Sequence, residues 1–218
     1  MKLIIFDFDG TLADSRKLIV EAQRRVFSEF GLPVPAPEAS LALIGRSLEL
    51  VLAELAGPEA PIAAMTAAYP PLVKELRADP AFADLPFAGV HDLLVELGAR
   101  SDLRLGIATG HISGAIEPAL AAFGWRELFC TVQSADKAPS KPHPGMILQA
   151  LDEAEIDASN AVMIGDTAFD IEMAHAAGVA AIGVGWGYHS RDRLDAAGAD
   201  FIADTVQDLR RHLNDGSR

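Results

Sequence analysis

The sequence predicts an α/β fold with a doubly wound parallel sheet, interrupted after its first strand by an inserted all-helical cap. Three observations support this fold class. Half of the 218 residues are hydrophobic, so the chain can bury a large core. Short apolar runs alternate with amphipathic stretches from about residue 85, as expected of strands joined by crossover helices. Helical patterns alone fill residues 15–84, so we expect a core of residues 1–14 and 85–218 and a cap between them.

The first strand is predicted at residues 3–6, a short apolar run that suits a strand buried on both faces. Asp7 and Asp9 follow it directly, and Gly10 then allows a turn. Ligands of parallel α/β folds bind at the edge formed by the carboxyl ends of the strands, where these acids are expected. Two carboxylates crowded there repel each other unless a cation or a proton separates their roles. The alternative is an ordinary strand end followed by an Asp-Gly turn.

The predicted cap begins with an amphipathic helix over residues 15–30, whose apolar residues share one face. A proline-containing linker follows, and residues 47–56 form the clearest helix after it. Residues 62–77 also have helical composition, but Pro70 and Pro71 lie in their middle. Each proline removes a backbone donor, which predicts a kink or two short helices.

The remainder of the chain is predicted to alternate between helices and strands. The expected strands lie at residues 105–108, 128–132, 161–164, 179–184 and 200–202. The expected helices lie at residues 90–99, 113–123, 144–154, 169–177 and 206–213. Right-handed crossovers between such strands produce a parallel sheet with helices on both faces.

Charge and composition exclude several classes of partner. Eighteen basic residues against 31 acidic ones give a net charge of −13, which argues against binding nucleic acid or an anionic membrane. Residues 173–190 lack Asp, Glu, Lys and Arg over the length of a membrane span, but their glycines divide them into a helix end, a turn and a strand. The N-terminal run is not that of a signal peptide, so a cytoplasmic protein is expected. The single cysteine, Cys130, excludes an internal disulfide and is expected in the core.

Four polar clusters adjoin the predicted strands at the same edge of the sheet. They are the Asp7/Asp9 pair, Thr109-Gly110, Lys141, and the run from Gly165 to Asp170. Together they hold four carboxylates, one ammonium group, one hydroxyl group and a turn rich in backbone N–H groups. Four acids in one cleft require compensation, which Mg²⁺ can supply because it prefers oxygen ligands. The metal and the ammonium group could then hold a dianionic phosphate, and the hydroxyl and N–H groups could complete the cradle.

These motifs resemble those of haloacid dehalogenase-like hydrolases, and within them the phosphoglycolate phosphatase group with a helical cap. They match in order as Asp7-Phe-Asp-Gly-Thr-Leu-Ala-Asp-Ser15, Ala108-Thr-Gly110, Lys141-Pro-His-Pro144 and Gly165-Asp-Thr-Ala-Phe-Asp170. The resemblance spans the whole chain and is weaker in the cap, where the two prolines interrupt an expected helix. It implies a Rossmann-like core and a phosphoric monoester hydrolase.

The resemblance also implies roles for individual residues. Asp7 would attack phosphorus to give an aspartyl-phosphate, and Asp9 would protonate the leaving alkoxide and then deprotonate the hydrolytic water. Lys141 would neutralise charge on Asp7 and the phosphoryl group. Mg²⁺ would bind the Asp7 carboxylate, the Asp9 carbonyl oxygen and Asp166, while Asp170 would be a ligand or an outer-shell orienter. Alternatively, Asp170 would only favour the dipole of its helix.

The candidates for binding the phosphate group itself are Gly10, Thr109, Gly110 and Lys141. Thr109 could equally cap the next helix. His111 could contact the leaving group or could serve in packing. Arg46, beside Gly45 at the start of a cap helix, could read a second negative group on the substrate or could be an exposed residue beside a turn.

The sequence therefore predicts a Mg²⁺-dependent phosphatase, monomeric or homodimeric, for a small phosphorylated metabolite such as phosphoglycolate. A sugar-phosphate mutase of the same superfamily and a non-catalytic phospho-acceptor or binding module are the alternatives. Asp9 argues against a haloacid dehalogenase, which needs a nucleophilic aspartate but no acid two residues later and no metal.

Overall fold

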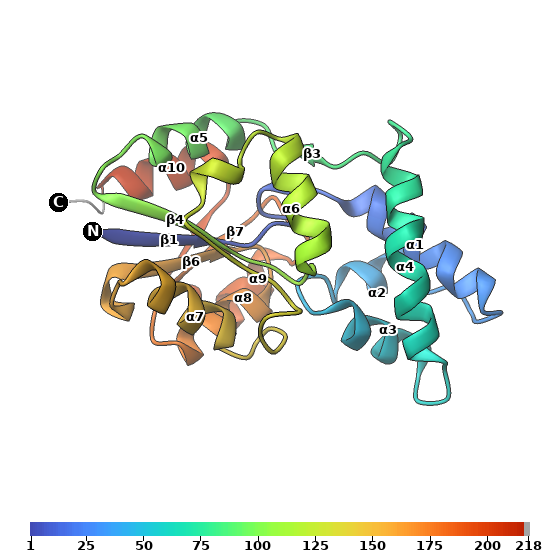
Figure 1. Ribbon diagram of the computed structural model, residues 1–218. Helices are drawn as coiled ribbons and strands as arrows, with labels where there is room; N and C mark the ends of the chain where they lie inside the picture. Colours follow the sequence, from blue (N-terminus) through green and yellow to red (C-terminus); the bar gives the residue numbers. More distant parts are fainter. Residues whose placement is uncertain (216–218) are drawn as a thin grey trace.

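A parallel sheet forms the centre of the protein in the computed structural model, which describes residues 1–215. Within those residues the sheet has six strands in the order β5-β4-β1-β6-β7-β8 (Figure 1). They are β1 (Lys2–Phe6), β4 (Leu103–Ala108), β5 (Thr131–Gln133), β6 (Ala161–Gly165), β7 (Ala180–Val184) and β8 (Phe201–Ala203). All neighbouring pairs are parallel, which confirms the predicted doubly wound sheet.

The strand order places the first strand of the chain inside the sheet, between β4 and β6. Phe6 at the end of β1 is paired with Ile107 on one side and with Ile164 on the other. These three strands therefore end at the same level. In an open α/β sheet, such a point of reversal in strand order is where ligands bind.

Helices cover both faces of the sheet because alternate residues of each strand point to opposite sides. Ile4 and Phe6 of β1 face a core with α5 (Val90–Gly98), α6 (Ser113–Ala122) and α10 (Val206–Asp215). The side chains of Leu3 and Ile5 face the other core. Its helices are α7 (Gly145–Ala154), α8 (Ala168–Ala176) and α9 (Arg191–Ala196).

A group of helices beyond the carboxyl ends of the strands forms what we call the helical segment (Figure 1). It comprises α1 (Arg16–Glu29), α2 (Pro37–Leu41), α3 (Leu48–Ala56) and α4 (Ile62–Arg77). Its helices pack around small apolar clusters of their own. The chain enters and leaves it through β2 (Ala13–Asp14) and β3 (Leu85–Pro86), which pair antiparallel.

The division into two short helices, one of the two outcomes predicted at Pro70 and Pro71, is wrong, because α4 is one helix across both residues. Both prolines are exposed, so water can solvate the carbonyl groups that they leave unpaired. The buried face of the same helix packs on α1 through Tyr69, Leu72 and Leu76. Tertiary packing therefore overrides the local penalty.

Other differences concern short or polar elements. Residues 126–128 are a 3₁₀ turn, so the strand predicted at 128–132 is confined to Thr131–Gln133. Sequence analysis missed α9 and did not delimit α2 within the region of helical pattern, because both helices are too short to show a clear period. Cys130 is exposed and does not lie in the core. Among residues 1–215, no helix has the length and apolar character needed to cross a membrane.

Candidate active site

The carboxyl ends of the strands gather six of the predicted site residues. Each of them is buried, with at most 8% of its surface exposed: Asp7, Asp9, Thr109, Lys141, Asp166 and Asp170. They come from the loops after β1, β4, β5 and β6 and from the start of α8. Strands that end at one level thus bring together residues that are far apart in the sequence.

Lys141 lies between two carboxylates in the centre of this group. Its Nζ atom is 2.8 Å from Asp7 Oδ1 and 2.6 Å from Asp170 Oδ1. Burial acts to lower the pKa of Lys141, but the carboxylates of Asp170 and Asp7 outweigh it and raise that pKa above its usual value. The lysine is therefore a permanent positive charge in the site.

Asp170 links this lysine to the start of α8. While its Oδ1 atom pairs with Lys141, its Oδ2 atom accepts hydrogen bonds from the Thr167 N–H at 3.1 Å and the Thr167 hydroxyl at 2.7 Å. The two residues form a capping box at the start of α8. Asp170 therefore caps its helix and also orients Lys141, while its predicted part in holding a metal stays a prediction.

Three carboxylates are close enough to hold a metal ion. Asp7, Asp166 and Asp170 each offer one oxygen atom, and these atoms lie within 4.8 Å of one another. Burial outweighs Lys141 and, with repulsion from Asp170 and Asp9, raises the pKa of Asp7 to about 7. Burial and the same kind of repulsion raise the pKa of Asp166 well above its usual range. Three buried acids against one lysine leave a negative excess, which fits a divalent cation.

Asp166 is held in a tight enclosure made by two glycines. It accepts hydrogen bonds from the Thr11 hydroxyl at 3.0 Å and the Tyr188 N–H at 2.8 Å. A Cβ atom on Gly10, whose φ is +78°, would lie 2.2 Å from Asp166 Oδ2. A Cβ atom on Gly187 would lie 2.1 Å from the Asp166 Cβ atom. Both positions therefore need glycine, and sequence analysis missed Gly187 as a site residue.

The N–H group of Gly10 is already hydrogen-bonded in this structure. Its amide donates a hydrogen bond to the Ala13 carbonyl at 2.8 Å. The phosphate contact predicted for Gly10 would require this bond to break. Its place beside Asp166 gives a sufficient physical reason for glycine here.

Asp9 has hydrogen-bond and ion-pair partners that differ from those of Asp7, Asp166 and Asp170. It accepts a hydrogen bond from the Ser15 hydroxyl, and its Oδ2 atom lies 2.8 Å from His111 Nε2. Burial acts to raise the pKa of Asp9, but His111 and Ser15 outweigh it and lower that pKa. Burial acts to lower the pKa of His111, but Asp9 outweighs it and raises that pKa. His111 therefore lies at the site as an ion-pair partner of Asp9.

Thr109 and Gly110 lie where the helical segment meets the sheet. The Thr109 hydroxyl accepts a hydrogen bond from the His111 N–H at 3.2 Å. A Cβ atom on Gly110 would lie 2.5 Å from the Arg46 carbonyl oxygen. The loop before α3 therefore comes into direct contact with the end of β4.

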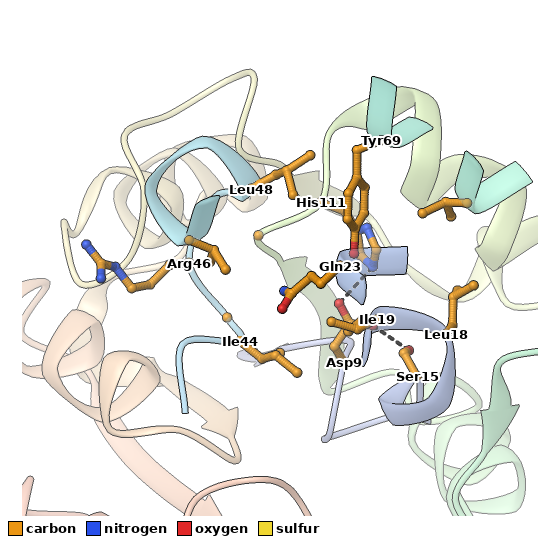
Figure 2. Close-up of a pocket in the computed structure, with 14 residues that line it drawn as sticks. Asp9, Ser15, Leu18, Ile19, Gln23, Ile44, Arg46, Leu48, Tyr69 and His111 are labelled. Carbon is orange, nitrogen blue, oxygen red and sulfur yellow. Dashed lines mark hydrogen bonds and ion pairs between the residues drawn. The ribbon is translucent and has the colours of Figure 1, made fainter. Parts of the chain in front are cut away.

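The side chain of Arg46 does not join this group of buried residues. Its guanidinium group pairs with Glu54 and lies over the Phe169 ring, 5.5 Å from the ring centroid. Figure 2 shows the side chain directed away from Asp9 and His111. The structure holds the guanidinium group against Glu54 and Phe169, and the contact of Arg46 with substrate stays a prediction.

A pocket of about 80 Å³ opens beside Asp9, between the helical segment and the end of β4 (Figure 2). Its lining from the helical segment is mostly aliphatic, with Gln23 and Tyr69 among the polar side chains. Sequence analysis missed Gln23, although a signal was present. It lies four residues from Ile19 and four from Phe27, so a polar residue interrupts the apolar face of the helix.

Comparisons with known proteins agree with the fold. The family model described as haloacid dehalogenase-like hydrolase matches residues 4–184. A probable phosphatase, IndB, from Dickeya dadantii is 36% identical over 211 residues, or 95% of this chain and 91% of that protein. A phosphoglycolate phosphatase from Synechococcus elongatus is 34% identical over 210 residues, or 96% and 95%. A haloacid dehalogenase-like hydrolase structure from Streptococcus pneumoniae has a TM-score of 0.85 at 26% identity, covering 98% of each chain.

We predict that Gly10→Ala destabilises the protein by more than about 1 kcal/mol, because the new methyl group displaces Asp166 in addition to straining the backbone. Gly31→Ala is the matched control, since Gly31 has a φ of +67° but open space around its Cβ position. Urea denaturation of both variants measures the difference. Equal losses for the two would mean that the approach to Asp166 does not matter.

Proposed function

The chain belongs to the haloacid dehalogenase-like hydrolase family, and on this premise we propose that it hydrolyses small phosphate monoesters with the aid of Mg²⁺. The observation that carries the proposal is the buried Lys141 between Asp7 and Asp170 at the carboxyl ends of the strands. A phosphate dianion needs such a positive charge next to the attacking group. The phosphatase names of the two relatives support the same reaction class.

Asp7 is the proposed nucleophile. One of its carboxylate oxygens attacks phosphorus in line with the ester oxygen, so that an aspartyl-phosphate forms as the phosphorus–ester bond breaks. The Lys141 ammonium group, 2.8 Å from Asp7 Oδ1, orients the carboxylate and offsets the charge of the incoming phosphate. The Thr109 hydroxyl and the Gly110 amide are the proposed donors to the transferring oxygens.

Asp9 is the proposed acid and base. In the first step a proton from the paired His111, whose pKa is raised, passes through Asp9 to the departing alkoxide. In the second step Asp9 takes a proton from the water that attacks the aspartyl-phosphate, which releases phosphate and restores Asp7. Its pairing with His111 and Ser15 supports this assignment, because these contacts hold the carboxylate at the wall of the pocket. A group that exchanges protons in both steps favours turnover over a passive phospho-acceptor module.

The oxygen atoms of Asp7, Asp166 and Asp170 fit Mg²⁺, because these three buried carboxylates have only one lysine to offset their negative charge. The raised pKa values of Asp7 and Asp166 agree with this shortage of positive charge. Asp7 and Asp166 are the residues that we propose as its side-chain ligands, with the Asp9 carbonyl oxygen. Asp170 supports Lys141 in this arrangement. When bound, the ion would offset negative charge on the transferring phosphoryl group.

We further propose that residues 15–84 act as a cap over the site. The helical segment contributes most of the pocket beside Asp9, and its loop contacts Gly110. Closure of such a segment excludes bulk water and selects the organic part of the substrate. The cytoplasmic location and the monomeric or homodimeric state stay predictions.

We predict that Asp7→Asn lowers the hydrolysis of an aryl phosphate by on the order of a thousandfold or more, because an amide is a poor nucleophile. Removal of Mg²⁺ with a chelator should lower the rate of the parent protein to a similar level. Asp14→Asn is the control, since Asp14 is an exposed acid in the same stretch of chain. Substantial turnover by folded Asp7→Asn protein would contradict the proposed nucleophile.

We predict that Asp9→Asn slows alkyl phosphates more than aryl phosphates, by on the order of tenfold or more. An aryl oxide leaves readily without a proton, whereas an alkoxide needs one. The kcat values of the variant and the parent protein on both substrate types measure the effect. Equal losses on the two types would contradict the role of Asp9 in protonating the leaving group.

A further inference from the structure

Gln23 places an unpaired amide oxygen in the pocket beside Asp9. The side chain projects from α1 and is only 2% exposed, and its Oε1 atom has no hydrogen-bond partner among the described residues. Figure 2 shows the amide in the space between Asp9 and the loop of Ile44. A buried polar atom without a partner is unfavourable, because it has lost its hydrogen bonds to water. A ligand group that pairs with the amide would remove this penalty.

Basic side chains around the pocket are already engaged by acids. His111 is 2.8 Å from Asp9, and Arg46 is turned away toward Glu54. Arg77, which lies outside the lining, is 2.8 Å from Asp84. A carboxylate on the organic part of the substrate would therefore be buried beside Asp9 without a counter-charge.

Most of the remaining side chains that line the pocket are aliphatic, namely Leu18, Ile19, Ile44, Leu48, Val51 and Val73. Tyr69 and Ser15 also line it, and the Ser15 hydroxyl already donates to Asp9. The volume of about 80 Å³ compares with roughly 10–15 Å³ for one water molecule by the same kind of measure, so the pocket admits a group of several heavy atoms. The lining suits a small, largely apolar organic group with a polar contact to Gln23.

We propose, building on the phosphatase function above, that this pocket receives the neutral, hydroxyl-bearing leaving group of a small phosphate monoester and that Gln23 selects it. A hydroxyl group can donate to the amide oxygen or accept from the amide nitrogen, so it satisfies the side chain in either orientation. An anionic leaving group such as that of phosphoglycolate lacks a matching charge in the pocket. Gln23 is thus a specificity-determining residue for uncharged alcohols.

Three esters of similar size test this proposal: 2-hydroxyethyl phosphate, n-propyl phosphate and phosphoglycolate. For the parent protein with Mg²⁺, kcat/KM for the hydroxyethyl ester should exceed that for the propyl ester by about tenfold, as one well-placed hydrogen bond provides. It should exceed the value for phosphoglycolate by at least as much. Gln23→Met keeps the length of the side chain but removes the amide, so the ratio of hydroxyethyl to propyl ester should fall to about one.

Gln207→Met, an exposed glutamine on α10, is the matched control and should keep the parent ratio. A parent protein that prefers phosphoglycolate or propyl phosphate would overturn the proposal, whether or not Gln23→Met folds. Retention of the parent ratio by folded Gln23→Met would overturn the role of Gln23. An aryl phosphate tests the reaction separately. If the protein hydrolyses it but does not show the expected preference among the three esters, this inference alone is overturned. If the protein hydrolyses no ester, the proposed function is overturned as well.

Discussion

The ion pairs of the buried Lys141 with Asp7 and Asp170 are the interaction on which the rest of the site depends. A lysine in this position is stable only because two carboxylates offset the loss of its hydration. The same contacts keep Asp7 beside a positive charge, and the capping box fixes Asp170 at the start of α8. The charges of the site therefore depend both on the strand ends that carry Asp7 and on the helix cap that holds Asp170.

The four motif acids divide into two groups with different surroundings. Asp7, Asp166 and Asp170 share one buried space with an excess of negative charge, which suits a cation. Asp9 faces the pocket, where it pairs with His111 and with Ser15 at the entrance to α1. The helix that begins there also carries Gln23. The end of the first strand is thus linked through a few residues to the wall that would contact the organic part of a substrate.

Much of the fold and part of the site could be predicted from the sequence. Apolar runs that end in polar motifs determine which residues meet at the carboxyl edge, so Asp7, Lys141 and Asp166 were identifiable. Features that depend on tertiary distance were not. The direction of Arg46 is set by Glu54 and Phe169, and the need for glycine at position 187 arises only once Asp166 is placed beside it.

The most direct test of the central claim is thermal unfolding of the metal-free protein against pH, with and without added Mg²⁺. Burial raises the pKa of Asp7 from 3.8 to about 7, so the folded state binds more protons than the unfolded chain between these values and stability should be lost as pH rises through them. Mg²⁺ binds the ionised carboxylates and should restore the Tm near pH 7, while metal-free Asp7→Asn should show a shallower loss. A Tm that neither falls over this range nor responds to Mg²⁺ would contradict the account.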